Sequence, residues 1–146
     1  MKTRAILSGL LITMLLHTPF SFAQTAKATV TVLVASNQGT EFDLDNDAFK
    51  DQLIKLFSYT SYHQVSAQAI QLAGAEGAKM DLPEGYQLLL NIQGEEEGRL
   101  LVKAVIQKDG TNYVDTVLSV LKEGIVCLGG PQVSGGDLVI VLEMSF

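Results

Sequence analysis

The stretch that decides the fold is YQLLLNIQGEEEGRLLVKAVIQKDGTNYVDTVLSVL, residues 86–121. Apolar and polar residues alternate in three successive segments of it, which is the pattern of strands with one buried face. Asp109-Gly110 separates the second segment from the third and is a strong signal for a two-residue hairpin turn. The run of glutamates at 95–97 predicts an exposed loop between the first and second segments. These residues therefore predict an antiparallel meander.

Further strands are expected on both sides of this meander. The segments rich in β-branched and apolar residues are 28–34, 59–72, 79–82, 125–128 and 137–144. The apolar residues of the segment 59–72 change face along the chain, so we expect a bulge near Gln68. The glycine-rich residues 129–136 predict a flexible loop before the last strand.

One amphipathic helix is expected over residues 47–58. Its apolar residues recur at helical spacing and are Phe49, Leu53, Leu56 and Phe57. Asp45 or Asn46 can cap its first turn. If the strands 28–34 and 59–72 are parallel, the helix between them forms a right-handed crossover.

These elements place the chain in the α+β class. We expect a largely antiparallel β-sheet or flattened β-sandwich of about eight strands with one packed α-helix. The sequence shows neither an internal repeat nor a second domain, so residues 24–146 are expected to form a single α+β domain.

The first 23 residues have the pattern of a secretory signal peptide. Lys2 and Arg4 precede an apolar run at 5–16, and small residues at Ser21 and Ala23 mark a cleavage point after Ala23. The run is too short to span a bilayer, which needs roughly 20 residues. We therefore expect a periplasmic or secreted protein after cleavage near Ala23.

The mature chain is expected to be acidic. Loss of Lys2 and Arg4 changes the net charge from −6 to −8, which argues against nucleic acid and anionic membrane surfaces as partners. The single cysteine, Cys127, excludes an internal disulfide and lies in an apolar strand, so we expect an inert, buried thiol.

Few residues can carry metal or phosphate chemistry. The acidic stretch beginning at Asp43 resembles the start of a calcium loop, but Ala48 and Ile54 occupy the sixth and twelfth positions, where such a loop needs Gly and Glu. The glycine pairs near the end of the chain lack the Lys and the following helix of a phosphate loop. We predict no metal site and no cofactor.

The residues with the strongest claim to a binding site form an aromatic patch. Phe57, Tyr59 and Tyr62 lie at the junction between the helix and the next strand, with His63 beside them. Their rings could contact a protein partner or an extended peptide, or they could simply pack in the core. His63 could also act with Cys127 or a carboxylate as a catalytic pair, although no catalytic signature surrounds either residue.

Three short segments carry a resemblance. They are 32–37 (VLVASN), 56–62 (LFSYTSY) and 128–131 (LGGP), followed by a closing apolar strand. This pattern resembles small exported bacterial proteins of unknown function, and the resemblance implies no activity. The Leu-Gly-Gly step before the last strand is also faintly similar to the end of secretin gates.

The alternating end of the chain, 138–146, resembles the terminal strand of bacterial outer-membrane proteins. The chain has no Trp and few aromatic residues, so we do not expect an integral membrane protein.

Three functions remain open at this point. We expect an exported, soluble and non-catalytic domain that binds a protein or cell-envelope partner, for which free sheet edges are suited. The first alternative is a small-ligand-binding sandwich with a pocket between helix and sheet. The second alternative is a small hydrolase that uses His63.

Overall fold

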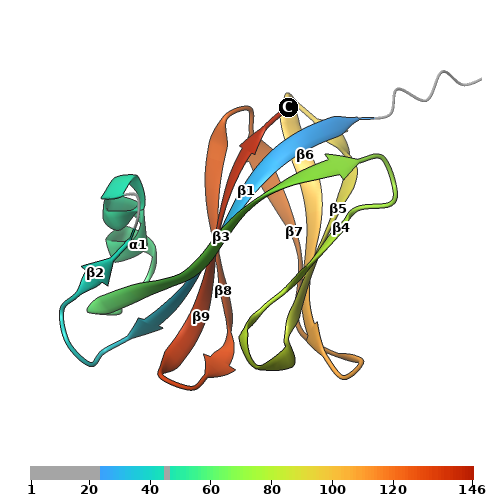
Figure 1. The fold of residues 1–146 in the computed structure, drawn as a ribbon. Helices are drawn as coiled ribbons and strands as arrows, with labels where there is room; N and C mark the ends of the chain where they lie inside the picture. The colour runs from blue at the N-terminus through green and yellow to red at the C-terminus, as the bar shows by residue number, and fades with distance from the viewer. Residues whose placement is uncertain (1–23, 45–46) are drawn as a thin grey trace, which may run out of the picture.

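The computed structural model describes residues 24–44 and 47–146, and this part of the chain forms two β-sheets and one short α-helix (Figure 1). The predicted signal peptide, residues 1–23, and the predicted caps Asp45 and Asn46 lie outside the described residues. Nine strands are present there, where the sequence predicted about eight. The predicted class is confirmed in its broad form, because the sheets are largely antiparallel and pack as a sandwich.

The larger sheet, called sheet A below, has the strand order β2-β3-β1-β9-β8. Its strands are β1 (Thr25–Ser36), β2 (Phe42–Asp43), β3 (Ser61–Ala73), β8 (Gly124–Val133) and β9 (Gly136–Ser145). All neighbours in it are antiparallel except β2 and β3, which pair in parallel over two residues. β1 and β9 are therefore the central strands.

The smaller sheet, called sheet B, contains the predicted meander in the order β4-β5-β6-β7. Its strands are β4 (Ala78–Asp81), β5 (Gln87–Glu96), β6 (Arg99–Lys108) and β7 (Thr111–Leu121), and a single 3-10 turn, Pro83–Gly85, precedes β5. Asp109 and Gly110 both have positive φ angles, 50° and 78°, as a type I′ hairpin turn requires. The glutamate run is less of a loop than expected, because β5 continues through Glu96 and only Glu97 and Gly98 form the turn.

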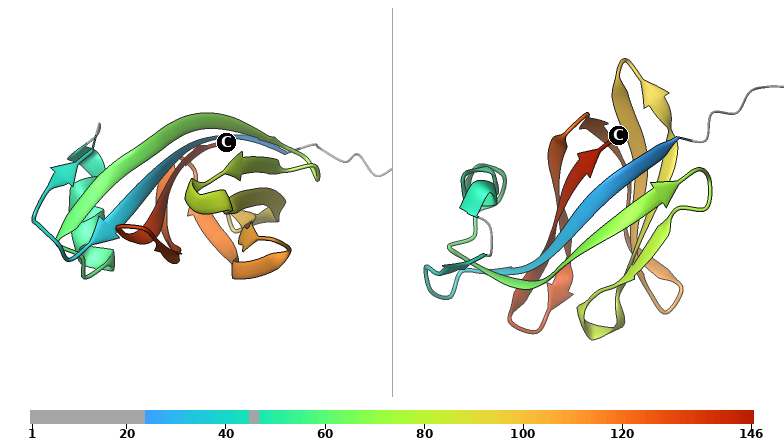
Figure 2. Two further views of the ribbon diagram at one scale, coloured as in Figure 1. Left: turned by 60° about the horizontal axis from the view of Figure 1, so that its bottom comes forward. Right: turned by 45° about the horizontal axis from the view of Figure 1, so that its top comes forward.

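The main core lies between the two sheets. β1 contributes Val30 and Val32, which are fully buried, because every second residue of a strand points to the same face. β9 and the strands of sheet B contribute the facing side chains, among them Leu138, Ile140, Leu142, Leu88, Leu90, Val102, Ile106 and Val120. Sheet B does not extend under the whole of β3, which arches over the molecule at one side (Figure 2).

The helix covers part of the opposite, outer face of sheet A. A 3-10 turn, Asp47–Phe49, leads into α1 (Lys50–Leu56), which is shorter than the predicted helix at 47–58. Phe49 and Leu53 are buried against Leu33, Val139 and Val141 of sheet A. Leu56, predicted to be buried, is 60% exposed. The helix ends at this residue and the chain becomes extended at Phe57, so the buried face of the helix does not continue.

The condition for a right-handed crossover, parallel strands on both sides of the helix, is not met. β1 and β3 pair antiparallel from Thr25 opposite Ala73 to Ser36 opposite Ser61, so the helix lies within a long connection between antiparallel neighbours. The predicted bulge exists but lies at Val65 rather than near Gln68, since Val32 is opposite Ser66 while Leu33 is opposite Gln64. Because of this bulge, the even-numbered residues of β3 before Val65 point to the outer face of sheet A, and those after Val65 point towards sheet B.

The glycine-rich segment before the last strand is also corrected. β8 continues through Gly129, Gly130 and Pro131 to Val133, where the sequence predicted a flexible loop. The register of β8 against β9 shifts between Gly129 and Gln132, so Pro131 lies at an irregularity where no ladder hydrogen bond from its nitrogen is needed. A Cβ on Gly130 would lie 3.0 Å from the Cβ of Leu138, so the two strands approach closely there.

Candidate functional site: the aromatic junction and the open edge of β3

The structure brings Phe57, Tyr59 and Tyr62 together but leaves them unequally accessible. The rings of Tyr59 and Tyr62 meet edge to face with centroids 6.2 Å apart, and the ring centroids of Phe57 and Tyr59 are 6.4 Å apart. Tyr62 is fully buried, and its hydroxyl donates a hydrogen bond to the carbonyl oxygen of Leu53 at 3.3 Å. Burial raises the pKa of the Tyr62 phenol. Tyr62 therefore anchors α1 to sheet A rather than offering a contact surface.

Tyr59 joins the segment just before β3 to the start of β9. Its hydroxyl donates a hydrogen bond to Oδ2 of Asp137 at 2.8 Å. This hydrogen bond is the main reason why the pKa of the Tyr59 phenol is raised, since it stabilises the neutral phenol beside a carboxylate. A hollow of about 400 Å³ lies beside Tyr59 and Asp137.

His63 lies at the surface next to Asp43, away from the aromatic cluster. Its Nδ1 is 2.5 Å from Oδ2 of Asp43, and β2 brings the two residues together because Asp43 is opposite His63 in the register. Both side chains are about two-thirds exposed, at 65% and 68%, so water solvates the pair.

The alternative of a catalytic pair between His63 and Cys127 is contradicted, because the two residues lie on opposite faces of sheet A. His63 is opposite Val34, whose side chain packs against the core between the sheets, whereas Cys127 is opposite Val141 on the outer face. Burial raises the pKa of the Cys127 thiol, which lowers its thiolate fraction and its reactivity. A nucleophilic cysteine needs surroundings that lower the pKa of its thiol.

Metal ligands do not gather in the described part of the chain. No group of three or more His, Cys, Asp or Glu side chains there could hold a metal ion.

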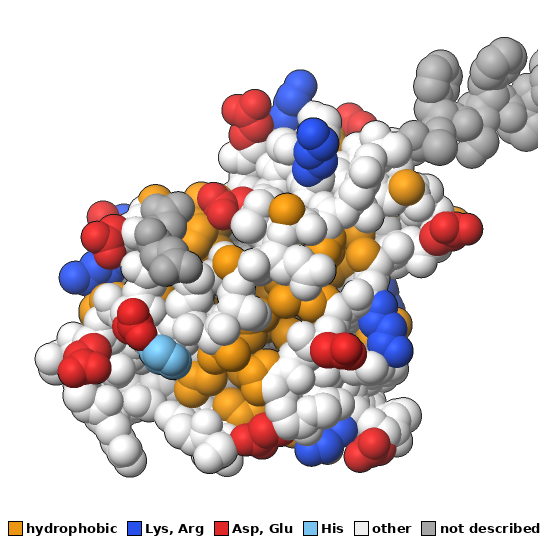
Figure 3. Space-filling model, in the orientation of Figure 1, with side chains coloured by type: hydrophobic (Ala, Val, Ile, Leu, Met, Phe, Trp, Pro, Cys, Tyr) orange, Lys and Arg blue, Asp and Glu red, His pale blue; other side chains and the backbone are white. Residues whose placement is uncertain are grey.

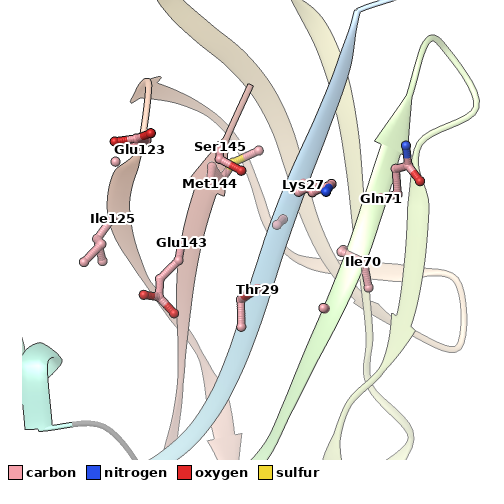
Figure 4. A pocket seen from close by; sticks show the side chains of 12 residues that line it. Lys27, Thr29, Ile70, Gln71, Glu123, Ile125, Glu143, Met144 and Ser145 are labelled. Carbon is pink, nitrogen blue, oxygen red and sulfur yellow. The ribbon is translucent and has the colours of Figure 1, made fainter.

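In the described part of the chain, buried side chains fill the contact between α1 and sheet A. Phe49, Leu53 and Tyr62 from one side meet Leu33 and Val139 from the other, and all five are buried. A larger hollow, of about 680 Å³, lies on the part of the outer face of sheet A that bears residues such as Lys27, Thr29 and Glu143 (Figure 4). Thr29 and Glu143 are directly opposite each other on β1 and β9.

The middle of β3 is the most open part of sheet A. β3 pairs with β1 along one edge, while along its other edge β2 pairs only with Tyr62 and His63. The five residues that follow Gln64 are all exposed: Val65, Ser66, Ala67, Gln68 and Ala69. In this stretch neither α1 nor sheet B covers β3. Sequence reasoning had placed these residues in a strand without identifying them as a site.

Charges avoid this strand. Residues 64–73 contain no Asp, Glu, Lys, Arg or Pro. β3 crosses the face turned to the viewer in Figure 1, and hydrophobic side chains gather in the middle of that face while acidic and basic side chains lie around its rim (Figure 3). An uncharged run of ten residues in an acidic protein was the signal in the sequence that could have identified this edge.

Comparison with protein families, with curated proteins and with solved structures finds no match to this chain. In residues 24–44 and 47–146, no helix combines the length and the apolar character required to cross a membrane.

Proposed function

We propose that this chain is an exported, non-catalytic domain that binds a protein partner by accepting an extended segment along the open edge of β3. The observation that carries the proposal is the stretch Val65–Ala69, exposed along a strand whose outer edge, within residues 24–44 and 47–146, pairs with another strand only at its beginning. The amide and carbonyl groups on the outer edge of a strand are ready to pair with another chain. In β-strand addition these main-chain hydrogen bonds supply affinity, and the alternate side chains supply specificity.

The composition of β3 supports this use of its edge. Proteins usually protect an exposed edge with Lys, Pro or inward-pointing charges, and residues 64–73 contain none of these. The edge strand β7 of sheet B differs, because Asp115 in its middle forms an ion pair with Lys103 at 2.5 Å. The bulge at Val65 sets the beginning of the regular edge, so a partner strand would run beside Ser66 and the residues after it.

The alternatives have weaker support. A hydrolase that uses His63 would have its base exposed to solvent beside Asp43 and on the other face of the sheet from Cys127. A small-ligand pocket between α1 and sheet A would have to displace the buried side chains of Leu53 and Tyr62.

The test compares two valines of similar exposure on two edge strands. Val65 is 46% exposed on β3 and Val117 is 52% exposed on β7. A photoreactive residue at position 67 is used to cross-link and identify the partner, and hydrogen exchange is then measured on the purified pair. Binding is expected to slow the exchange of the amides of β3 that face its open edge. Val65→Lys should weaken binding at least tenfold, whereas Val117→Lys should leave it unchanged.

Two results would refute the proposal. The first is a partner that protects another surface and binds the Val65→Lys variant as tightly as the original chain. The second is a hydrogen-exchange result in which none of the proteins that cross-link to position 67 slows the exchange of any amide between residues 65 and 71. Circular dichroism of both variants controls for loss of the fold.

A further inference from the structure

We infer that the segment accepted at the open edge of β3 is an amphipathic strand that carries a Lys or Arg opposite Ala69. Its alternate residues would be apolar and would point towards sheet B. The inference rests on the proposed use of this edge and names the chemistry of the partner that the edge fits.

The main chain of β3 presents hydrogen-bonding groups to the open edge at alternate residues. The amide of Gly74 donates a hydrogen bond to the carbonyl oxygen of Gln24 at 3.0 Å, so the even-numbered positions at the end of β3 face β1. The main-chain groups of Ala67, Ala69 and Gln71 therefore face the other edge. No strand of residues 24–44 and 47–146 pairs with them there.

The usable length of this edge is limited at both ends. β2 pairs with Tyr62 and His63, and the bulge at Val65 follows directly, so an added strand must leave the edge at that point. At the other end the turn begins at Gly74. A segment beside positions 66–72, about seven residues long, fits between these limits without meeting β2. Its central residue lies opposite position 69.

Across the outer face of sheet A, one row of residues leads from this edge to an acidic side chain. Ala69 is opposite Thr29 on β1, and Thr29 is opposite Glu143 on β9. All three line the hollow of about 680 Å³ (Figure 4). Three strand spacings, roughly 14 Å, separate Glu143 from a residue opposite Ala69. Ala69 and Thr29 are short, so a long side chain from the segment can extend over them towards Glu143.

Charge complementarity favours a cationic side chain in this row. The ion pairs formed within residues 24–44 and 47–146 do not include Glu143, which is partly buried, and Glu123 adds a second carboxylate to the hollow. Lys27, which also lines the hollow, points towards Gln71 rather than towards Glu143 (Figure 4). A basic residue is therefore expected opposite Ala69 but not opposite Gln71, where it would meet Lys27.

The inner face of the same edge favours apolar side chains. Ile70 is partly buried and packs against the main core. Ser66 and Gln68 also point to the side of sheet B but are exposed, because sheet B does not extend under this part of β3 (Figure 2). An apolar side chain opposite Ile70 would cover this open side of the core. Successive residues of a strand point to opposite faces, so one segment can be apolar on one face and basic on the other.

The first experiment titrates the full chain with three synthetic peptides. Their sequence is Val-Thr-Val-X-Val-Thr-Val with blocked ends, where X is Arg, Gln or Glu, and it reads the same in both directions, so neither strand direction is assumed. Amide NMR and hydrogen exchange should show slower exchange at Ala67, Ala69 and Gln71, whereas Gln68 and Ile70 are already paired with β1. The Gln peptide should bind about threefold and the Glu peptide about tenfold more weakly than the Arg peptide.

The second experiment changes the carboxylate. Glu143→Lys should reverse the order of the Arg and Glu peptides, and Glu143→Gln, which keeps the shape of the side chain, should make their affinities nearly equal. Asp81→Lys is the matched control, because it changes the net charge equally on the outer face of sheet B and should keep the preference for Arg. Circular dichroism of the three variants controls for loss of the fold.

The outcomes separate this inference from the proposed function. If the Arg and Glu peptides bind equally, or if Glu143→Lys leaves their order unchanged, the basic residue is refuted. The same holds if no peptide binds or if the peptides protect another surface. If a cross-linked protein then still slows the exchange of Ala67, Ala69 and Gln71, the proposed function stands without this inference. If no peptide and no cross-linked protein protects these amides, both are refuted.

Discussion

β1 and β3 are neighbours in one sheet and nearly equal in length, but their surroundings are opposite. β1 is paired on both edges, with β3 and β9, and residues 30–33 in its middle are all buried. β3 is paired with β1 on one edge and briefly with β2 on the other, and residues 65–69 in its middle are all exposed. A strand paired on both edges supports the fold, whereas a strand with one open edge can interact with another molecule.

The largest expected effect is on the close packing around β1. A Cβ on Gly136, at the start of β9, would collide with the backbone carbonyl of Ala35, and the positive φ of Gly136 adds strain. Gly136→Ala should destabilise the fold by about 3 kcal/mol or more. Gly135→Ala is the control, because its Cβ would have no neighbour closer than 4.0 Å although its φ is also positive. Urea unfolding of the two variants measures the difference, and equal losses would contradict the collision.

The second prediction makes the same change in both strands. Val32 on β1 is fully buried and Val65 on β3 is 46% exposed. Val32→Ala should cost about 2 kcal/mol, because it removes buried methyl groups and leaves a cavity. Val65→Ala should change stability by less than about 0.5 kcal/mol. Similar losses in denaturant unfolding would show that β3 is buried after all.

A smaller effect is expected where Tyr59 holds the segment just before β3 against β9. Tyr59→Phe removes the hydrogen bond to Asp137 and should cost about 1 kcal/mol. Asp137→Asn should lower the pKa of the Tyr59 phenol towards its usual range, because the carboxylate acceptor is lost. Absorbance titration of the phenols, with Tyr59→Phe as the reference, measures this change.

The pH dependence of this contact has a defined sign. Because the pKa of Tyr59 is raised in the folded state, the contact contributes stability below the ordinary tyrosine pKa of about 10. That contribution is lost as the pH rises through the raised value. A stability curve that falls equally in Tyr59→Phe would assign the alkaline loss to other groups.

The smallest effect concerns β8, at the other edge of sheet A. Cys127 is half-buried and burial raises its pKa, so it should react with alkylating reagents more slowly than a free cysteine at neutral pH. Alkylation should reach the free-thiol rate only when urea unfolds the protein. Reaction at the free-thiol rate in the native state would show that this edge opens readily.

Local patterns predicted the parts of the fold that depend on nearest neighbours. The meander followed from alternation in residues 86–121 and from the hairpin turn at Asp109 and Gly110, both confirmed. The helix was predicted in the right place but too long. Periodicity cannot show that the chain becomes extended at Phe57, four residues before β3 begins.

Long-range pairing was the part that local patterns could not supply. The direction of β3 against β1 depends on which strands meet across the whole chain, and the same alternation suits parallel and antiparallel neighbours. The aromatic residues of the candidate site were identified correctly as a cluster. Their unequal burial was not visible in the sequence, because Tyr62 is enclosed only when α1 packs on sheet A.

The sequence by itself determined that this chain is rich in β-strands and acidic, because these properties follow from composition and short-range alternation. Only the tertiary structure decided that the middle of β3 is open. Exposure of an edge depends on where the other strands and the helix end, and residues distant in the chain set those limits.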